Sequence, residues 1–515
     1  MSDELLDALR NIFLLFWFCC VFTGVFVIGS NYGLEKFEID IKAFRLQQFE
    51  ASGKSYGSKA WKVLNDVVSI NESVLRKCAV IPWKELVTID FEAKFQSTPV
   101  GAVLIILPND LGKLSVDETS TFLDIEQRFA TLHTELAVYF AEDSPLLRIL
   151  LKSVQSAPGN APTALQQFWS ALMADNFQIA SSNGASSNVA SNKVFNVIAH
   201  LNAAERGRPY LFIVAHYDTY GIIPSLGIGS DSNGSGTAVL LELLAILSQI
   251  YSLPSHKARY NLVFVLSAGG KFSYQGSRSF IDDFNERHSD ERIALAICLD
   301  NEGFSLHSNF EAFCQSTSRA YLEKISLASD RLAWEHEIYN IRRIHAVTIS
   351  HFSNHSDPFR NSLLDIPTSL DFSVLEDNAK LIANALVSFV FDLDSRLCNN
   401  AKENNLACSL LNDAVEVDPK KAQGVGVDHQ LVTNLFEVVK RLAHSAHVSE
   451  IVVNDFALYD IVEDTLTATI VKPAIFELIL ASCICIYLYF LYCLSMHAQF
   501  AAEATALRIR RILSQ

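Results

Sequence analysis

Three short segments of this chain carry side chains that bind metal ions or transfer protons. His216 follows the apolar run 210–215, and Asp218 stands two residues later. Asp300 follows the apolar run 293–299, and Asp231 lies in the glycine-, serine- and asparagine-rich segment 229–236. Imidazole and carboxylate side chains can bind metal ions or move protons. A binding or catalytic site formed by these segments is therefore the first possibility to test.

The elements that must position these side chains alternate along the chain. Short apolar runs predict strands, and amphipathic or apolar stretches between them predict helices at about 236–251, 277–284 and 375–391; the predicted strands are 210–215, 262–266, 293–299 and 346–350. This alternation predicts an α/β fold with a mostly parallel sheet flanked by helices on both faces. Ligands in such folds bind beyond the carboxyl ends of the strands, where the candidate residues stand.

The chain divides into several predicted regions. Residues 31–180, with strand-like runs at 102–107 and 136–140, predict a smaller amino-terminal α/β lobe, and 181–192 is a serine- and asparagine-rich loop. The main α/β domain is expected over 190–395. The more polar stretch 396–472 is expected to form a juxtamembrane stalk.

Apolar segments at both ends indicate membrane targeting. The run 12–28 places a signal peptide or signal anchor within 1–30, either cleaved or retained. Residues 474–496 predict a transmembrane helix, followed by a short cytosolic tail, 497–515, with three arginines. The body between them is then lumenal. A net charge of −16 with no cluster of basic residues excludes nucleic acid as a partner.

An oxidising lumen would permit disulfides and glycans. Of the ten cysteines, five lie in the body, and Cys398 and Cys408 flank a polar loop that a disulfide could close. Acceptor sequences for N-glycosylation occur at Asn71, Asn233 and Asn354.

The order of these motifs resembles the nicalin family, nicastrin-like and catalytically inactive relatives of the M28 zinc aminopeptidases. The resemblance rests on HYD at 216–218, DSNGSG at 231–236, GGKF and YQG between 269 and 276, CLD at 298–300, AWEHE and IRR between 333 and 343, and KPAIFEL at 472–478. It is strong over 190–395, good in the last membrane helix and weak in the amino-terminal lobe. It implies an M28 aminopeptidase-like fold.

Carried over residue by residue, the M28 pattern leaves a vestigial site. It places a zinc ligand and its partner carboxylate on His216 and Asp300, an orienting carboxylate on Asp218, and the first acid of the glycine-rich loop on Asp231. The other positions have lost their function: the bridging carboxylate is Ser232, the general base Gly270, a ligating glutamate Lys271 and the late histidine Asn361. His351 or His355 could replace that histidine if the loop is displaced. No catalytic residue, metal or other cofactor is expected.

A polar cluster without metal needs another source of charge balance. We expect Lys271 to pair with Asp218 or Asp300 and neutralise buried carboxylates. The neighbouring Trp334, Glu335, His336 and Glu337 are interpreted as packing and surface residues, because adjacent residues on a helix do not share a face.

The resemblance implies a non-catalytic scaffold in the endoplasmic reticulum membrane. It implies a complex with a Nodal-modulator-like lumenal protein and a small multispanning membrane protein, associated with the Sec61 translocon and, through it, the ribosome. Multipass membrane-protein biogenesis, receptor assembly and antagonism of Nodal signalling are attached to the family. Two alternatives stay open: an active zinc aminopeptidase, and a nicastrin-like substrate receptor for a membrane protease.

Overall fold

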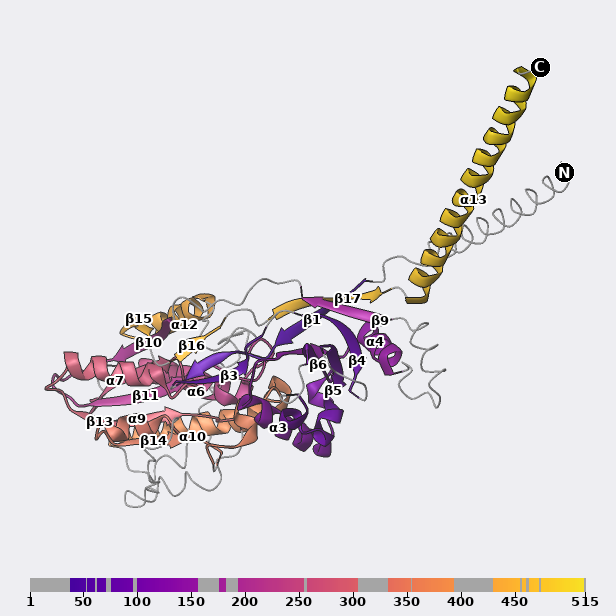
Figure 1. Ribbon diagram of the computed structural model, residues 1–515. Coiled ribbons are helices and arrows are strands. Elements are labelled where there is room, and N and C mark those ends of the chain that lie inside the picture. The colour runs from indigo at the N-terminus through magenta and orange to yellow at the C-terminus, as the bar shows by residue number, and fades with distance from the viewer. Residues whose placement is uncertain are drawn as a thin grey trace.

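A computed structural model gives the architecture of the chain (Figure 1). It describes residues 38–51, 53–60, 63–70, 76–95, 100–155, 176–181, 193–253, 257–303, 332–352, 354–392, 429–453, 456–459, 463–471 and 474–513. The predicted signal segment, Asn71, Cys398 and Cys408 lie outside the described residues. A two-lobed body is joined at one end to a long helix.

The larger lobe is built on a six-stranded sheet in the order β14-β13-β11-β12-β10-β15. The strands are β10 (Lys193–Leu201), β11 (Tyr210–His216), β12 (Asn261–Ser267), β13 (Ile293–Leu299), β14 (Ala346–Ile349) and β15 (Ser445–Val452). The four strands from β14 to β12 run parallel, and β10 and β15 are added antiparallel at one side. The expected mostly parallel sheet flanked by helices is confirmed.

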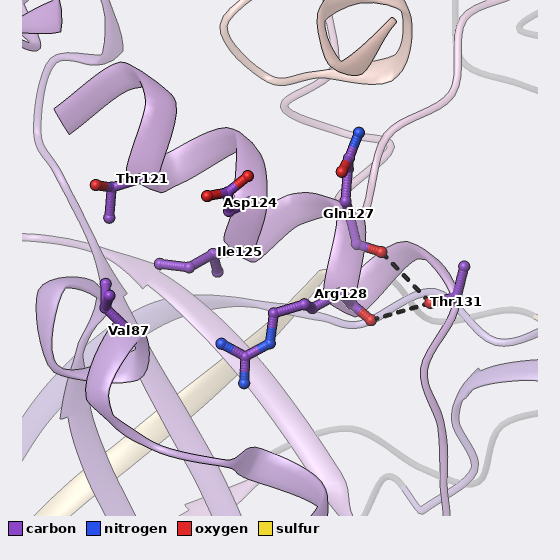
Figure 2. A pocket seen from close by; sticks show the side chains of 7 residues that line it. All are labelled: Val87, Thr121, Asp124, Ile125, Gln127, Arg128 and Thr131. Atoms are coloured by element: carbon purple, nitrogen blue, oxygen red, sulfur yellow. Dashed lines mark hydrogen bonds between the residues drawn. The ribbon is translucent and has the colours of Figure 1, made fainter. Parts of the chain in front are cut away.

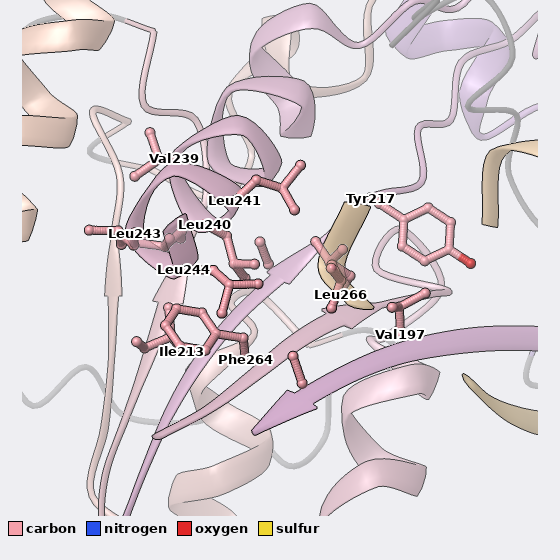
Figure 3. Close-up of a cluster of buried hydrophobic side chains, with 14 of the residues drawn as sticks. Val197, Ile213, Tyr217, Val239, Leu240, Leu241, Leu243, Leu244, Phe264 and Leu266 are labelled. Atoms are coloured by element: carbon pink, nitrogen blue, oxygen red, sulfur yellow. The ribbon is translucent and has the colours of Figure 1, made fainter. Parts of the chain in front are cut away.

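Helices cover both faces of this sheet because its strands are apolar on both sides. Leu211 and Ile213 of β11 pack in a core with α6 (Gly236–Tyr251), α10 (Phe372–Phe391) and α12 (His429–Leu442), part of which Figure 3 shows. Phe212 and Val214 point the other way, into a core with α7 (Gln275–Arg287) and α9 (His336–Ile341). Alternate residues of one strand thus serve two cores, which is the pattern of a buried parallel strand.

The smaller lobe is a closed barrel in the order β1-β17-β9-β4-β5-β6-β8. The strands are β1 (Glu38–Arg45), β4 (Leu64–Ser69), β5 (Cys78–Pro82), β6 (Ala102–Leu107), β8 (Ala137–Glu142), β9 (Asn176–Ser181) and β17 (Glu463–Val471). One face of the strands packs on α4 (Pro145–Gln155), and the other packs on η1 (Trp83–Thr88), α2 (Phe91–Phe95) and α3 (Val116–Ala130). A small sheet, β16-β2-β3-β7, comprises Phe456–Leu458, Phe49–Ala51, Lys54–Ser58 and His133–Thr134.

The expectation of a stalk over 396–472 is wrong for the part of that stretch that the structure describes. Helix α12 packs on the large sheet, β15 extends that sheet beside β10, and β17 lies between β1 and β9 in the barrel. The carboxy-terminal part of the body therefore closes both lobes instead of spacing them from the membrane.

Helix α13 (Ala474–Leu513) leaves the body directly after β17. Residues 480–513 form an exposed stretch long and apolar enough to cross a membrane; 230–251 pass the same test but are largely buried beneath the sheet. The 40 residues of α13 extend about 60 Å at 1.5 Å per residue, twice the thickness of a bilayer core of about 30 Å. The helix thus continues through residues 497–513 of the predicted tail.

Candidate functional site

The predicted site residues meet at the carboxyl ends of the parallel strands. His216 ends β11, Ser267 ends β12 just before the turn to Lys271, and Asp300 follows β13. The helical turn η4 (Ser230–Ser235) leads into α6 above the same edge. Because β11 pairs directly with β12 and β13, side chains far apart in the sequence become neighbours. The residues that the sequence placed at strand ends therefore lie together at one edge of the sheet.

The surface hollow in Figure 2 is separate from this cluster. Its volume is about 550 Å³, and its lining comes from η1, α3 and the residue just after α3. None of the predicted site residues lines it.

His216 lies between two carboxylates and has no exposed surface. Its Nε2 is 4.0 Å from Oδ1 of Asp300, and its Nδ1 is 3.6 Å from Oε2 of Glu335. The other Glu335 oxygen accepts hydrogen bonds from the hydroxyls of Ser267 and Ser277, at 2.7 and 2.5 Å. Glu335 is thus a buried residue of the cluster, and the expectation that it could lie on the surface is wrong.

The buried cation that pairs with Asp300 is Arg360. Its Nη2 donates to Oδ2 of Asp300 and to the Tyr274 hydroxyl, the latter at 3.0 Å, and Nη1 donates to the Ala333 carbonyl at 3.0 Å. The guanidinium also stacks 4.5 Å from the centre of the Trp334 ring. Burial is the largest single effect and acts to raise the pKa of Asp300, but Arg360, His216 and Lys271 together outweigh it, and the pKa is lowered.

Lys271 reaches the same cluster but contacts other groups than expected. Its ammonium donates to the Ser232 hydroxyl at 2.5 Å and to the Arg360 carbonyl at 3.0 Å, rather than pairing with Asp218 or Asp300. Burial and the nearby Arg360 charge lower the pKa of Lys271 to about 8, against the opposing effect of the surrounding carboxylates.

Gly270, which the M28 resemblance aligns with the general base, is packed so closely that no side chain fits there. A Cβ atom built there would press on the imidazole ring of His216, closer than non-bonded atoms can approach. The Gly270 N–H also donates to Oδ1 of Asp218 at 2.8 Å. Asp218 is buried, and this burial raises its pKa. A glutamate at position 270 would require this turn to move.

The loop 229–236 is held by a network of hydrogen bonds. The Asp365 carboxylate accepts the backbone N–H groups of Asp231 and Ser232, both at 2.8 Å. The Asp231 carboxylate in turn accepts the Ser235 hydroxyl at 2.9 Å and the Gly303 N–H at 2.8 Å. Asp231 and Ser232 therefore lie in the cluster, and the hydrogen bonds of both residues hold the loop in place.

Burial decides between the two described glycosylation candidates. Asn233 has no exposed surface, and its Nδ2 donates to the carbonyls of Leu299 and His216 at 2.8 and 3.0 Å. A glycan on that nitrogen is incompatible with this fold, so the prediction at Asn233 is wrong. Asn354 is exposed and remains a candidate.

The late-histidine position is occupied differently from the prediction. Asn361 is exposed, whereas the preceding Arg360 is buried in the cluster. Of the two alternative histidines, His351 lies 3.5 Å from Asp231 and 2.8 Å from the Asn301 carbonyl, both measured from Nδ1. His355 is exposed.

These residues do not fit a two-zinc centre. Zinc requires several free histidine or carboxylate donors, yet Asp300 is engaged by the Arg360 guanidinium and an ammonium lies nearby. Within the described residues, no group of three or more histidine, cysteine, aspartate or glutamate side chains is arranged to hold a metal ion. The contacts that the cluster makes are those that balance buried charge.

Two comparisons define the class of protein. Residues 196–373 match the Peptidase family M28. The crystal structure of nicastrin, a gamma-secretase component, superposes with a TM-score of 0.54 at 9% identity, covering 83% of this chain and 99% of that one. The protein therefore has a nicastrin-like variant of the M28 peptidase fold.

Sequence relatives define the family more narrowly. The chain is 32% identical to nicalin of Caenorhabditis elegans, with 99% of this chain and 100% of that protein covered. It is 32% identical to BOS complex subunit ncln of Danio rerio and 29% identical to BOS complex subunit NCLN of Homo sapiens, with 88% or 89% of this chain and 89% of each relative covered. The chain belongs to the nicalin family.

Proposed function

We propose that this protein is a non-catalytic scaffold subunit of a BOS-type complex in the endoplasmic reticulum membrane, with a lumenal body and a short cytosolic tail. The names of its relatives support membership of such a complex. The exposed apolar character of α13 supports the membrane anchor.

The observation that carries the non-catalytic role is the buried Arg360–Asp300 ion pair. A zinc ion and a guanidinium compete for the same carboxylate, and the guanidinium is already desolvated and held by Tyr274 and Ala333. Lys271 adds a second basic group, which further disfavours a divalent cation. The fold of a peptidase is thus retained while its metal-binding chemistry is replaced.

The partners in this proposal follow from the nicalin resemblance. They are a Nodal-modulator-like lumenal protein and a small multispanning membrane protein, with the Sec61 translocon and the ribosome engaged indirectly. Multipass membrane proteins and receptors are the clients, and antagonism of Nodal signalling is a further role. In this setting residues 1–30 act as the targeting signal, and Asn71 and Asn354 are the glycan acceptors.

The test combines two measurements on the full-length protein purified from detergent extract. Metal content by plasma mass spectrometry and aminopeptidase turnover, with and without added zinc, are both expected at background. About two zinc ions per chain with chelator-sensitive turnover, the signature of a co-catalytic site, would instead establish an active aminopeptidase.

The co-purifying proteins provide the second half of the test. The proposal predicts translocon components and a small multispanning protein in the same extract. Recovery of a presenilin-type protease in their place would favour the nicastrin-like substrate receptor. The Arg360→Met variant is a useful companion, since loss of partners with an intact fold would link the cluster to assembly.

A further inference from the structure

Helix α4 carries exposed aliphatic side chains on its outward face, although the body to which it belongs is acidic. Leu147 and Leu150 are fully buried against the barrel interior, together with Val154. On the opposite side, Leu146 and Ile149 are 45% and 48% exposed. Two large aliphatic side chains thus stand one helical turn apart on the surface.

The charged residues within α4 are all basic. The helix contains Arg148 and Lys152 but no acidic residue, although the whole chain carries a net charge of −16. Arg148 is held at the start of the helix by an ion pair with Asp143, whose two carboxylate oxygens accept from its Nε at 2.8 and 2.9 Å. Aliphatic residues flanked by basic ones on a short helix are typical of segments that lie in the interface of a bilayer.

The topology brings this helix near the membrane anchor. Helix α4 packs against β4 and β9, and β9 is the neighbour of β17 in the barrel. The last residue of β17, Val471, pairs with Asn176 of β9 and is only three positions before the start of α13. Three peptide units reach at most about 11 Å. Figure 1 accordingly shows α4 at the end of the body from which α13 leaves.

We infer that the outward face of α4, formed by Leu146, Arg148, Ile149 and Lys152, rests on the surface of the membrane that α13 crosses. The aliphatic side chains enter the boundary between headgroups and acyl chains, and the ammonium of Lys152 meets the lipid phosphates, while Arg148 stays paired with Asp143. The contact would fix the tilt of the body over the bilayer. It rests on α13 being a membrane anchor and is independent of any partner protein.

The tether makes such a weak contact effective. A short apolar helix by itself binds a bilayer poorly, but a covalent link to α13 raises the local concentration of membrane at this surface. The remaining body is strongly acidic and would be repelled by anionic lipid, so the exposed aliphatic face of α4 next to the anchor also selects the orientation.

Photocrosslinking tests the inference in the intact protein. The full-length chain is produced with benzoylphenylalanine at Ile149, irradiated in native membranes, and analysed by mass spectrometry for lipid adducts. Leu381 of α10 is the matched control, because it is a helix-surface leucine with 42% exposure on an element far from α13. Leu488 of α13 is the positive control.

Lipid adducts at Ile149 and Leu488, but not at Leu381, are expected. A Leu146→Ser variant labelled at Ile149 should lose adducts severalfold without a change in melting temperature, because one of the two inserted side chains is removed. Adducts at Leu488 alone, or protein adducts at Ile149, overturn the α4 contact and leave the anchor standing. No lipid adduct at any position overturns the anchor, and the α4 contact with it.

Discussion

The guanidinium of Arg360 and the carboxylate of Asp300 form a buried ion pair across 60 residues of sequence, at the edge of the sheet where a metallopeptidase would bind zinc. The pair is the centre of a network: Arg360 also bonds Tyr274 and Ala333, and its own carbonyl accepts a hydrogen bond from Lys271. The negative charge of the buried Asp300 carboxylate is thus balanced from within the chain.

Replacing Arg360 with methionine is expected to lower the free energy of unfolding of the large lobe by about 3–5 kcal/mol, because Asp300 is left buried without its partner. Urea unfolding of the full-length protein in detergent measures the change. Arg342→Met is the matched control, since Arg342 pairs with Asp282 at a more exposed position and should cost less than about 1 kcal/mol. Equal effects of the two substitutions would contradict the central role of the pair. Adding Asp300→Asn to Arg360→Met should recover part of the loss.

Replacing Lys271, unlike replacing Arg360, is not expected to destabilise the protein at neutral pH. The folded pKa of Lys271, about 8, lies below the ordinary value of 10.5. The unfolded chain therefore binds more protons than the native one between these values, and the Lys271 contribution makes stability rise as pH increases from about 8 to 10.5. Lys271→Met should remove this rise, which is on the order of 3 kcal/mol, and should be neutral or stabilising at pH 7.

Unfolding of wild type and variant at several pH values isolates this contribution. Lys113→Met is the control, because an exposed hydrogen bond to Asp110 raises the pKa of Lys113 and moves its titration out of the window. If Lys271→Met keeps the wild-type pH dependence, the ammonium is not desolvated as described.

Glu126 couples the barrel lobe to the loop that carries Arg360. From α3, its carboxylate accepts the Leu363 N–H at 2.8 Å and the Ser362 hydroxyl. Burial raises the pKa of Glu126 to about 7, although both hydrogen bonds oppose the shift. The native state therefore holds a proton that the unfolded chain releases near pH 4.5, and this contribution to stability is lost as pH rises from about 4.5 through 7.

Glu126→Gln should abolish that loss while keeping the carbonyl acceptor for Leu363. The observable is the melting temperature across pH 4.5 to 7, in which the variant is expected to vary less than wild type. Glu118→Gln is a fitting control: the hydrogen bond from Lys84 lowers the pKa of Glu118 to about 2, outside the window. Parallel curves for wild type and Glu126→Gln would mean that Glu126 is ionised throughout.

The sequence predicted the place of the cluster better than its members. Strand ends are marked by apolar runs that stop at a polar residue, so His216 and Asp300 could be found. Arg360 and Glu335 could not be identified as members of the cluster from the sequence, because no local pattern shows that the segment after β13 folds back over the sheet. The alignment of the late histidine selected Asn361, which is one residue away from Arg360, the side chain that enters the cluster. Adjacent residues of the helical turn that contains them face different sides, so an error of one residue exchanges a buried side chain for an exposed one.

Strand β17 was missed for a different reason. Its buried residues alternate, with Asp464, Leu466 and Ala468 facing inward, which is a strand pattern. The interpretation as a stalk depended instead on the polar composition of the whole stretch before the membrane helix. Partners as distant as β1 lie at the other end of the chain, and no local signal specifies such a pairing.

The position of β17 predicts where the body can be cut. A chain ending after Val471 keeps the strand, whereas one ending after Tyr459 loses it and retains β15 and β16; neither contains α13. Without β17, β1 and β9 lose their shared neighbour, and the face that carries Ile41 and Ile179 is opened to water.

Limited proteolysis should then cleave the barrel of the shorter chain about tenfold faster or more, since exposed strands open at low free energy. The large lobe keeps all of its strands in both chains and serves as the internal control. Equal protease resistance of the two barrels would show that the pairing of β17 with β1 and β9 contributes little, and that the carboxy-terminal segment lies outside the folded lobe.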